Sequence, residues 1–177
     1  MNKAFLAYGI VITAFFCGCS GQDMPQHPQS SDYFDIKKYF EQEAARLEKQ
    51  NTRINKTVVV DGSGETKSVA IADWKKELGV FMDAEITRAS WRGQFKIEKT
   101  ADGASYTSSE DKIPVKKLSV ISRNGKVTGI IILIKNNNIL YRSVDSLVYY
   151  PDSVYQVIKH QNIRFLSDKT YTVKGNF

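Results

Sequence analysis

Apolar residues recur at helical spacing from residue 33 to about residue 51, with lysine, glutamate and arginine between them. The residues that share this apolar face are Tyr33, Ile36, Phe40, Ala44 and Leu47. Positions three and four apart lie on one side of an α-helix, so the pattern predicts an amphipathic helix that ends near Asn51. Ser30, Ser31 or Asp32 can cap its first turn, because their side-chain oxygens accept hydrogen bonds from free backbone N–H groups.

Two β-branched runs, 56–60 and 66–71, flank a turn at 61–65 that contains Gly62 and Gly64. This arrangement predicts a β-hairpin. Asp73 can then cap a second helix over about 73–85, which Gly79 weakens modestly. The residues on its shared side are Trp74, Leu78, Phe81, Met82 and Glu85.

Strand signals dominate after Ile86. Residues 91–99 alternate between apolar and polar side chains, and Asp102-Gly103 predicts a turn before a short strand over 105–108. Asn124-Gly125 is the pair that two-residue type I′ turns prefer, so it predicts paired strands over 115–123 and 126–135. The register that this turn sets pairs Leu118 with Ile131, Val120 with Gly129 and Ile121 with Thr128.

Asparagines at 136–138 predict the next turn, and further strands are predicted over 138–148, 153–166 and 169–174. These elements predict a single α+β domain over 32–177. Two N-terminal helices pack on a curved, mainly antiparallel β-sheet of about six to nine strands, a meander with a half-barrel as its strongly curved form. The plan is similar in architecture to the cradle of periplasmic lipoprotein carriers and to lipocalin-like or cystatin-like sheets, and such a similarity carries no function.

The run 130–134 is apolar on both faces, whereas an antiparallel strand with one wet face should alternate. The helices can cover one side, and the other side needs barrel curvature, a partner or a ligand. One interpretation is an ordinary filled core. The other is a hydrophobic cleft that holds an acyl chain, with tyrosines at its rim. The candidate ligand or partner face comprises Ile130, Ile132, Ile134, Tyr141, Tyr149 and Tyr150.

The chain begins with one cation, Lys3, and an apolar run over 4–16 that is too short to span a bilayer as a helix. This N-terminal segment ends on Gly18-Cys19. The ending resembles the lipobox of bacterial lipoproteins, although Phe16 and Cys17 depart from the usual pattern. The resemblance implies a signal peptide over 1–18, acylation of Cys19 and a Pro/Gln-rich tether over 19–31. A plain secretory signal or a buried N-terminal helix is the alternative.

Residue 20 is Ser and not Asp, so the familiar inner-membrane retention signal is absent. By resemblance, this favours a lipid-anchored protein of the cell envelope at the outer membrane. A diglyceride and an N-acyl chain together would hold the protein on the membrane permanently, because each buried methylene contributes roughly 0.8 kcal/mol.

The amino-acid composition limits which catalytic and metal-binding sites the domain can contain. Both cysteines lie in the signal region, which excludes thiol catalysis and Cys-ligated zinc or iron–sulfur sites in the domain. His160 is the domain's single histidine, so no metal site and no cofactor are expected. The sequence around Asp61 lacks the distal ligands of a calcium loop. The net charge of +6 is dispersed without a basic block among aromatics, so no nucleic-acid partner is expected.

These observations predict a non-catalytic envelope lipoprotein that binds an apolar guest or an envelope protein partner, and no catalytic residue is named. One alternative is a hydrolase of envelope polymers. Its candidate carboxylates, Asp83 with Glu85 and Glu110 with Asp111, are neighbours in sequence and not placed to face each other across a cleft. The other alternative is a structural subunit of an envelope assembly.

Overall fold

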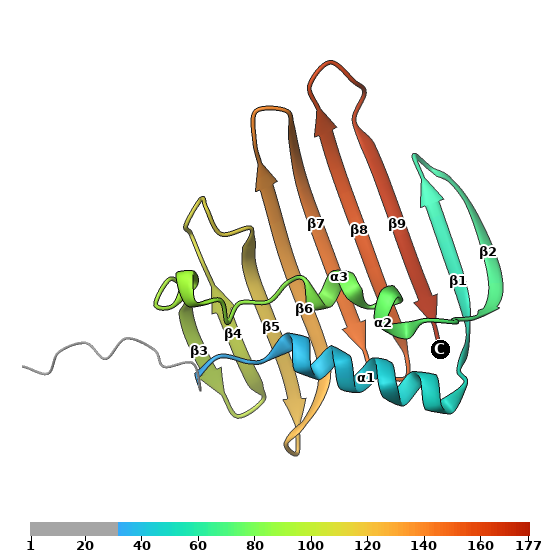
Figure 1. Cartoon of the computed structure of the whole chain (residues 1–177), viewed down its shortest axis with the longest axis horizontal. Helices are drawn as coiled ribbons and strands as arrows, with labels where there is room; N and C mark the ends of the chain where they lie inside the picture. Colours follow the sequence, from blue (N-terminus) through green and yellow to red (C-terminus); the bar gives the residue numbers. More distant parts are fainter. Residues whose placement is uncertain (1–31) are drawn as a thin grey trace, which may run out of the picture.

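The computed structural model describes residues 32–177, whose strands form one sheet with the helical segments on one of its faces (Figure 1). The helical segments are α1 (Ile36–Gln50), α2 (Trp74–Glu77), α3 (Gly79–Met82) and the 3-10 helix η2 (Ala89–Trp91). The strands are β1 (Arg53–Val60), β2 (Ser63–Ala70), β3 (Lys96–Thr100), β4 (Gly103–Thr107), β5 (Val115–Arg123), β6 (Lys126–Asn137), β7 (Tyr141–Tyr150), β8 (Val154–Ile163) and β9 (Lys169–Asn176).

The nine strands follow the order β2-β1-β9-β8-β7-β6-β5-β4-β3, and every pair is antiparallel. Strands β3 to β9 form a meander, and β1 then pairs with β9, which brings the two ends of the described chain into one sheet. Edge strands β2 and β3 do not meet, so the sheet is open. The predicted α+β class and the antiparallel sheet are therefore confirmed.

Helix α1 presents its predicted apolar side to the core. Its buried residues are Ile36, Phe40, Ala44 and Leu47. The ring of Phe40 lies 4.8 Å from that of Phe81 in α3 and 5.0 Å from that of Tyr149 in β7. The helix begins later than predicted, because the side chain of Asp35, and not of Asp32, accepts the capping hydrogen bond from the Lys38 N–H at 2.9 Å. Ser30 and Ser31 lie outside the described residues.

Two predicted elements are wrong in detail. The second helix is divided into α2 and α3, because Leu78 takes φ −90° and ψ 5° between them, outside the helical region. The strand predicted over 91–99 starts only at Lys96. Trp91 ends a 3-10 turn instead, and Gly93 has a φ of +77°, which breaks an extended strand.

The predicted register of the β5–β6 hairpin is wrong by one residue. Ile121 pairs with Gly129 and Ser122 with Val127, so Thr128 is an extra residue that forms a β-bulge. Beyond the bulge, Leu118 lies opposite Ile132 and Val120 opposite Ile130. This bulge directs Ile130 and Ile132 to the helix-covered face of β6, and the intervening residue Ile131 to the other face.

Candidate functional site

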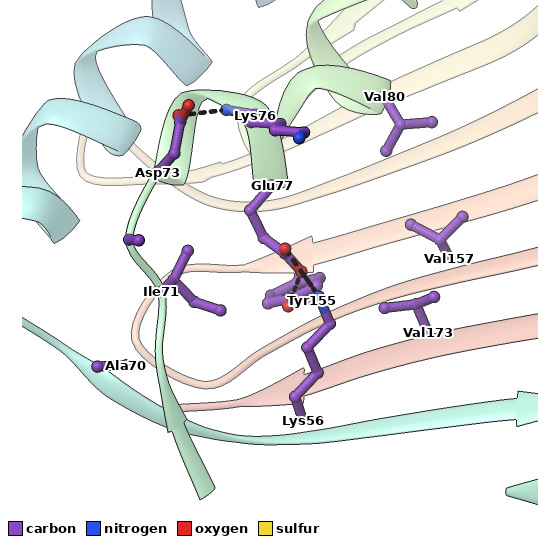
Figure 2. Close-up of a pocket in the computed structure, with 11 residues that line it drawn as sticks. Lys56, Ala70, Ile71, Asp73, Lys76, Glu77, Val80, Tyr155, Val157 and Val173 are labelled. Atoms are coloured by element: carbon purple, nitrogen blue, oxygen red, sulfur yellow. Dashed lines mark hydrogen bonds and ion pairs between the residues drawn. The ribbon is translucent and has the colours of Figure 1, made fainter. Parts of the chain in front are cut away.

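An open cleft of about 620 Å³ lies between α2–α3 and strands β1, β8 and β9. Figure 2 shows Val80 of α3 above Val157 and Val173 of the sheet, with Ile71 on the opposite side. These four apolar side chains are partly buried and belong to its lining. The remaining lining residues are Lys56, Ala70, Ala72, Asp73, Lys76, Glu77 and Tyr155.

Three polar side chains converge between Ile71 and the three valines of the cleft (Figure 2). The buried Tyr155 donates its hydroxyl hydrogen to Oε1 of Glu77. The ammonium of Lys56 lies 2.7 Å from that same oxygen and 2.8 Å from Oε2. Both carboxylate oxygens of Glu77 are thus engaged: Oε1 by the phenol and the ammonium, and Oε2 by the ammonium.

Burial, together with the hydrogen bond to Glu77, raises the pKa of the Tyr155 hydroxyl above its ordinary value. The phenol therefore remains protonated and serves as a hydrogen-bond donor at neutral pH. It is not poised as a nucleophile or as a base. The arrangement suits a structural connection between α2 and the sheet, and it leaves the valine wall free to contact a ligand.

The local sequence explains why these groups meet. Asp73 caps α2 by accepting a hydrogen bond from the Lys76 N–H at 2.8 Å, and the buried Trp74 anchors this turn. Gly175 lies opposite Tyr155 in the β8–β9 pair. A Cβ at Gly175 would lie 2.1 Å from Cε1 of Tyr155, so only glycine lets the ring lie against this strand.

The predicted ligand face falls on different parts of the molecule. Ile130 and Ile132 are fully buried beneath the helices, and Ile134 beside them is partly buried. Tyr149 is also fully buried, and its hydroxyl donates to Oε2 of Glu43 in α1 at 2.6 Å. Tyr141 is partly exposed at the start of β7, where its backbone N–H donates to Asn138 Oδ1 at 2.8 Å.

Tyr150 lies on the opposite face of the sheet, because successive strand residues alternate. A Cβ at Gly129 would lie 2.7 Å from its ring and 3.2 Å from Cδ1 of Ile121, so both side chains fold over this glycine. The residues of this open face on the central strands include Ile131, Leu133, Val148 and Ile158, all partly buried. The six predicted residues therefore do not line one site.

None of the predicted residues lines the cleft. Its wall combines β1, which ends at Val60, with β8, which begins at Val154, and with β9, so no local pattern marks it. The sequence feature that points to the cleft is the pair of β-branched strands that contain Val157 and Val173. In the structure these two valines lie on the same face as Tyr155.

A second polar group lies on the helix-covered face. Asp145 is buried, with Lys159 at 3.6 Å from its Oδ2, while its Oδ1 has no hydrogen-bond partner. Asn136 and Ser143 lie beside it, and Asn136 Nδ2 donates to Ser143 Oγ at 3.2 Å. Lys159 is therefore the cation that faces this buried carboxylate.

The carboxylates of the hydrolase alternative are also placed. Asp83 is exposed at the end of α3, and Glu85 accepts a hydrogen bond from Thr87 Oγ1 at 2.7 Å. Glu110 and Asp111 are exposed in the loop before β5.

The histidine and the acidic turn that the sequence singled out both lie at the surface. His160 is exposed on β8, with Nδ1 3.0 Å from Thr170 Oγ1. Asp61 accepts a hydrogen bond from the Thr170 N–H at 2.8 Å and so fastens the β1–β2 turn to β9. Residues 32–177 contain no group of three or more acidic, histidine or cysteine side chains placed to hold a metal ion. Cys19 lies outside the described residues.

Comparison with known proteins found no similarity to any family model, curated protein or solved structure. Among the helices that the structure describes, none has the length and apolar character needed to cross a bilayer.

Proposed function

We propose that this chain is a lipid-anchored protein of the cell envelope whose folded part is a non-catalytic binding domain for an apolar guest. The observation that carries the proposal is the cleft beside α2–α3, where Ile71, Val80, Val157 and Val173 present an open apolar wall. Ligand sites are typically concave and mostly apolar, with a few placed polar groups, and their volumes are roughly 300–1,000 Å³. The cleft meets this description.

The polar group within the cleft supports binding rather than chemistry. Glu77 is held by Tyr155 and Lys56, so its carboxylate has no free oxygen to act as a general base. The exposed ammonium of Lys76 stands at the mouth of the same cleft. A guest with an apolar chain and an anionic head, such as a fatty acid, fits this combination of a valine wall and a cation.

The anchor and the shape belong to the same proposal. Acylation of Cys19, by resemblance to the lipobox, would hold the protein at the outer membrane through residues 19–31. We further infer that the helices and the sheet act together as a half-barrel cradle around the guest. The packing of α1 and α3 on β7, through Phe40, Phe81 and Tyr149, supports this shape.

A fluorescent fatty acid tests the binding proposal. The full chain should increase the emission of cis-parinaric acid in a saturable way. Val80→Trp fills the cleft and should weaken binding at least about tenfold. Val144→Trp makes the same change on the exposed open face and should leave binding unchanged. Equal binding by both variants, or no saturable binding by the native chain, would contradict the proposal.

A second candidate function is that of a subunit in an envelope assembly. The open sheet face supports it, because Ile131, Leu133, Val148 and Ile158 remain partly exposed there and other envelope proteins could cover them. A photo-crosslinker placed at Val148 in cells should then yield one discrete protein adduct. Lys126, the first residue of β6, is the control position. Adducts of equal yield at both positions would argue against this function.

A further inference from the structure

The four most exposed large apolar side chains of the described residues lie on two neighbouring turns. Ile139 and Leu140, in the β6–β7 turn, are 83% and 71% exposed. Phe165 and Leu166, in the β8–β9 turn, are 91% and 64% exposed. The two turns are joined by a hydrogen bond of 2.9 Å from the Arg164 N–H to the Leu140 carbonyl oxygen. We call this pair of turns, residues 138–141 and 163–168, the apolar tip.

The apolar tip projects from the end of the sheet that lies away from α1 (Figure 1). Solvated turns normally consist of Gly, Pro, Asn, Asp and Ser. Phe165 departs from this rule, because it has a φ of +68° while its ring is turned to solvent. A positive φ is unfavourable for a bulky residue, and nothing in the core requires an aromatic ring here. The backbone thus holds an apolar side chain outward at a cost in stability.

Cations surround these four apolar side chains. The segments 135–142 and 163–169 contain Lys135, Arg142, Arg164 and Lys169, against the single acid Asp168. The guanidinium of Arg164 lies 5.0 Å from the ring centre of Phe165. Asp168 is already bonded to Asn162 at 2.6 Å. The charge around the tip is therefore positive, in contrast to the paired charges elsewhere on the surface.

We propose that the apolar tip inserts into the interface of a membrane that contains anionic lipids. Apolar side chains would enter the boundary between headgroups and acyl chains, while the cations would contact the lipid phosphates. A specific protein partner is a poorer fit, since such interfaces use roughly 20–30 residues on each side. The tip offers only four exposed apolar residues on a protrusion, and a lipid surface needs no matching shape.

This contact does not depend on acylation of Cys19 or on the cleft, so it fails or succeeds separately from the proposed function. Insertion of the tip would orient the sheet with its tip end at the membrane surface.

A local fluorescent reporter tests the contact in the full chain. Phe165→Trp should show a blue-shifted emission with phosphatidylcholine–phosphatidylglycerol vesicles, and brominated lipid should quench it. Lys126→Trp carries the same reporter at the opposite end of β6 and should show neither effect. A response at residue 126 would report attachment that does not involve the tip, such as attachment through the N-terminal region alone. The unsubstituted chain reports the background of Trp74 and Trp91.

Removing charge tests the second half of the proposal. Arg142→Gln with Arg164→Gln, in the Phe165→Trp background, should lower partition into anionic vesicles about 30-fold. Partition into pure phosphatidylcholine should change little. The proposal is overturned if Phe165→Trp gives no shift with either vesicle, or if Lys126→Trp responds equally. It is also overturned if a photo-crosslinker at residue 165 in cells reacts with one protein and not with lipid.

Discussion

Tyr149 and Tyr155 lie directly opposite each other in the β7–β8 pair, and each donates its hydroxyl to a glutamate on a different helical segment. Tyr149 bonds Glu43 of α1, and Tyr155 bonds Glu77 of α2. Each glutamate is also held by a cation, Arg46 or Lys56. The helical layer is therefore fastened to the sheet by two matched buried tyrosines as well as by apolar packing.

Tyr155→Phe should lower the free energy of unfolding by about 1–3 kcal/mol, since a hydrogen bond to a charged group contributes this much and its loss leaves Glu77 with one partner fewer. Urea unfolding measures the change. Tyr141→Phe is the matched control, because that ring is partly exposed and its loss of a hydroxyl should alter stability by less than about 0.5 kcal/mol. Equal effects at the two positions would show that the Tyr155–Glu77 hydrogen bond does not stabilise the fold.

Stability should fall as the pH rises above about 10, the ordinary pKa of tyrosine. Burial and the bonds to Glu43 and Glu77 raise the pKa of Tyr149 and Tyr155 in the folded state. Above pH 10 the unfolded chain releases protons that the folded chain retains, so alkaline conditions favour unfolding. The contribution is fully present below that pH.

Urea midpoints measured between pH 8 and about 11.5 check this dependence. The double variant Tyr149→Phe and Tyr155→Phe lacks these two buried phenols, so its midpoint should fall less steeply over the same range. The buried Tyr106, whose pKa is also raised by burial, is present in both proteins. The other titratable side chains are present in both proteins, so the comparison isolates the two phenols. Parallel pH profiles for the two proteins would contradict the expectation.

Gly175→Ala should destabilise the fold by about 3 kcal/mol or more, because the new Cβ would lie 2.1 Å from the ring of Tyr155 and overpack a buried site. Gly79→Ala is the matched control. No atom lies within 4 Å of a Cβ at Gly79, so alanine there should be neutral or add up to about 1 kcal/mol through its helix propensity. Thermal unfolding of both variants measures the contrast, and a tolerated Gly175→Ala would show that the ring can move.

Local patterns predicted most of the sheet but not the cleft. The alternation of side chains and the Asn124-Gly125 turn place β5 and β6 almost to the residue. The pairing of β1 with β9 is different, because it joins residues more than a hundred positions apart and no turn specifies it. The cleft depends on that pairing. The sequence pattern therefore identifies the β-branched residues of the cleft, but it does not show that they line the same cleft.

The identity of the outward face also escaped prediction. A regular two-residue hairpin would pair Leu118 with Ile131, whereas the bulge at Thr128 pairs Leu118 with Ile132. One extra residue exchanges the two faces of a strand that is apolar on both sides. In the run 130–134, hydrophobicity alone could not distinguish the core side from the open side.

Deleting Thr128 should leave the fold intact, because the two residues around it already pair with consecutive residues of β5. Val127 lies opposite Ser122, and Gly129 lies opposite Ile121. Removing the bulge residue makes this pairing regular and keeps Ile130 and Ile132 in the core. We expect a change in the free energy of unfolding within about 2 kcal/mol and an unaltered far-ultraviolet circular dichroism spectrum.

Deleting Ile131 is the matched comparison, and it removes one residue from the same strand. It would move every later residue of β6 to the opposite face relative to β5, and Ile132 would leave the core. The free energy of unfolding should then fall by well over about 2 kcal/mol, because Leu133 and Lys135 would take the core-side positions of Ile132 and Ile134. If the chain lacking Thr128 unfolds as readily as the chain lacking Ile131, the bulge does more than set the register.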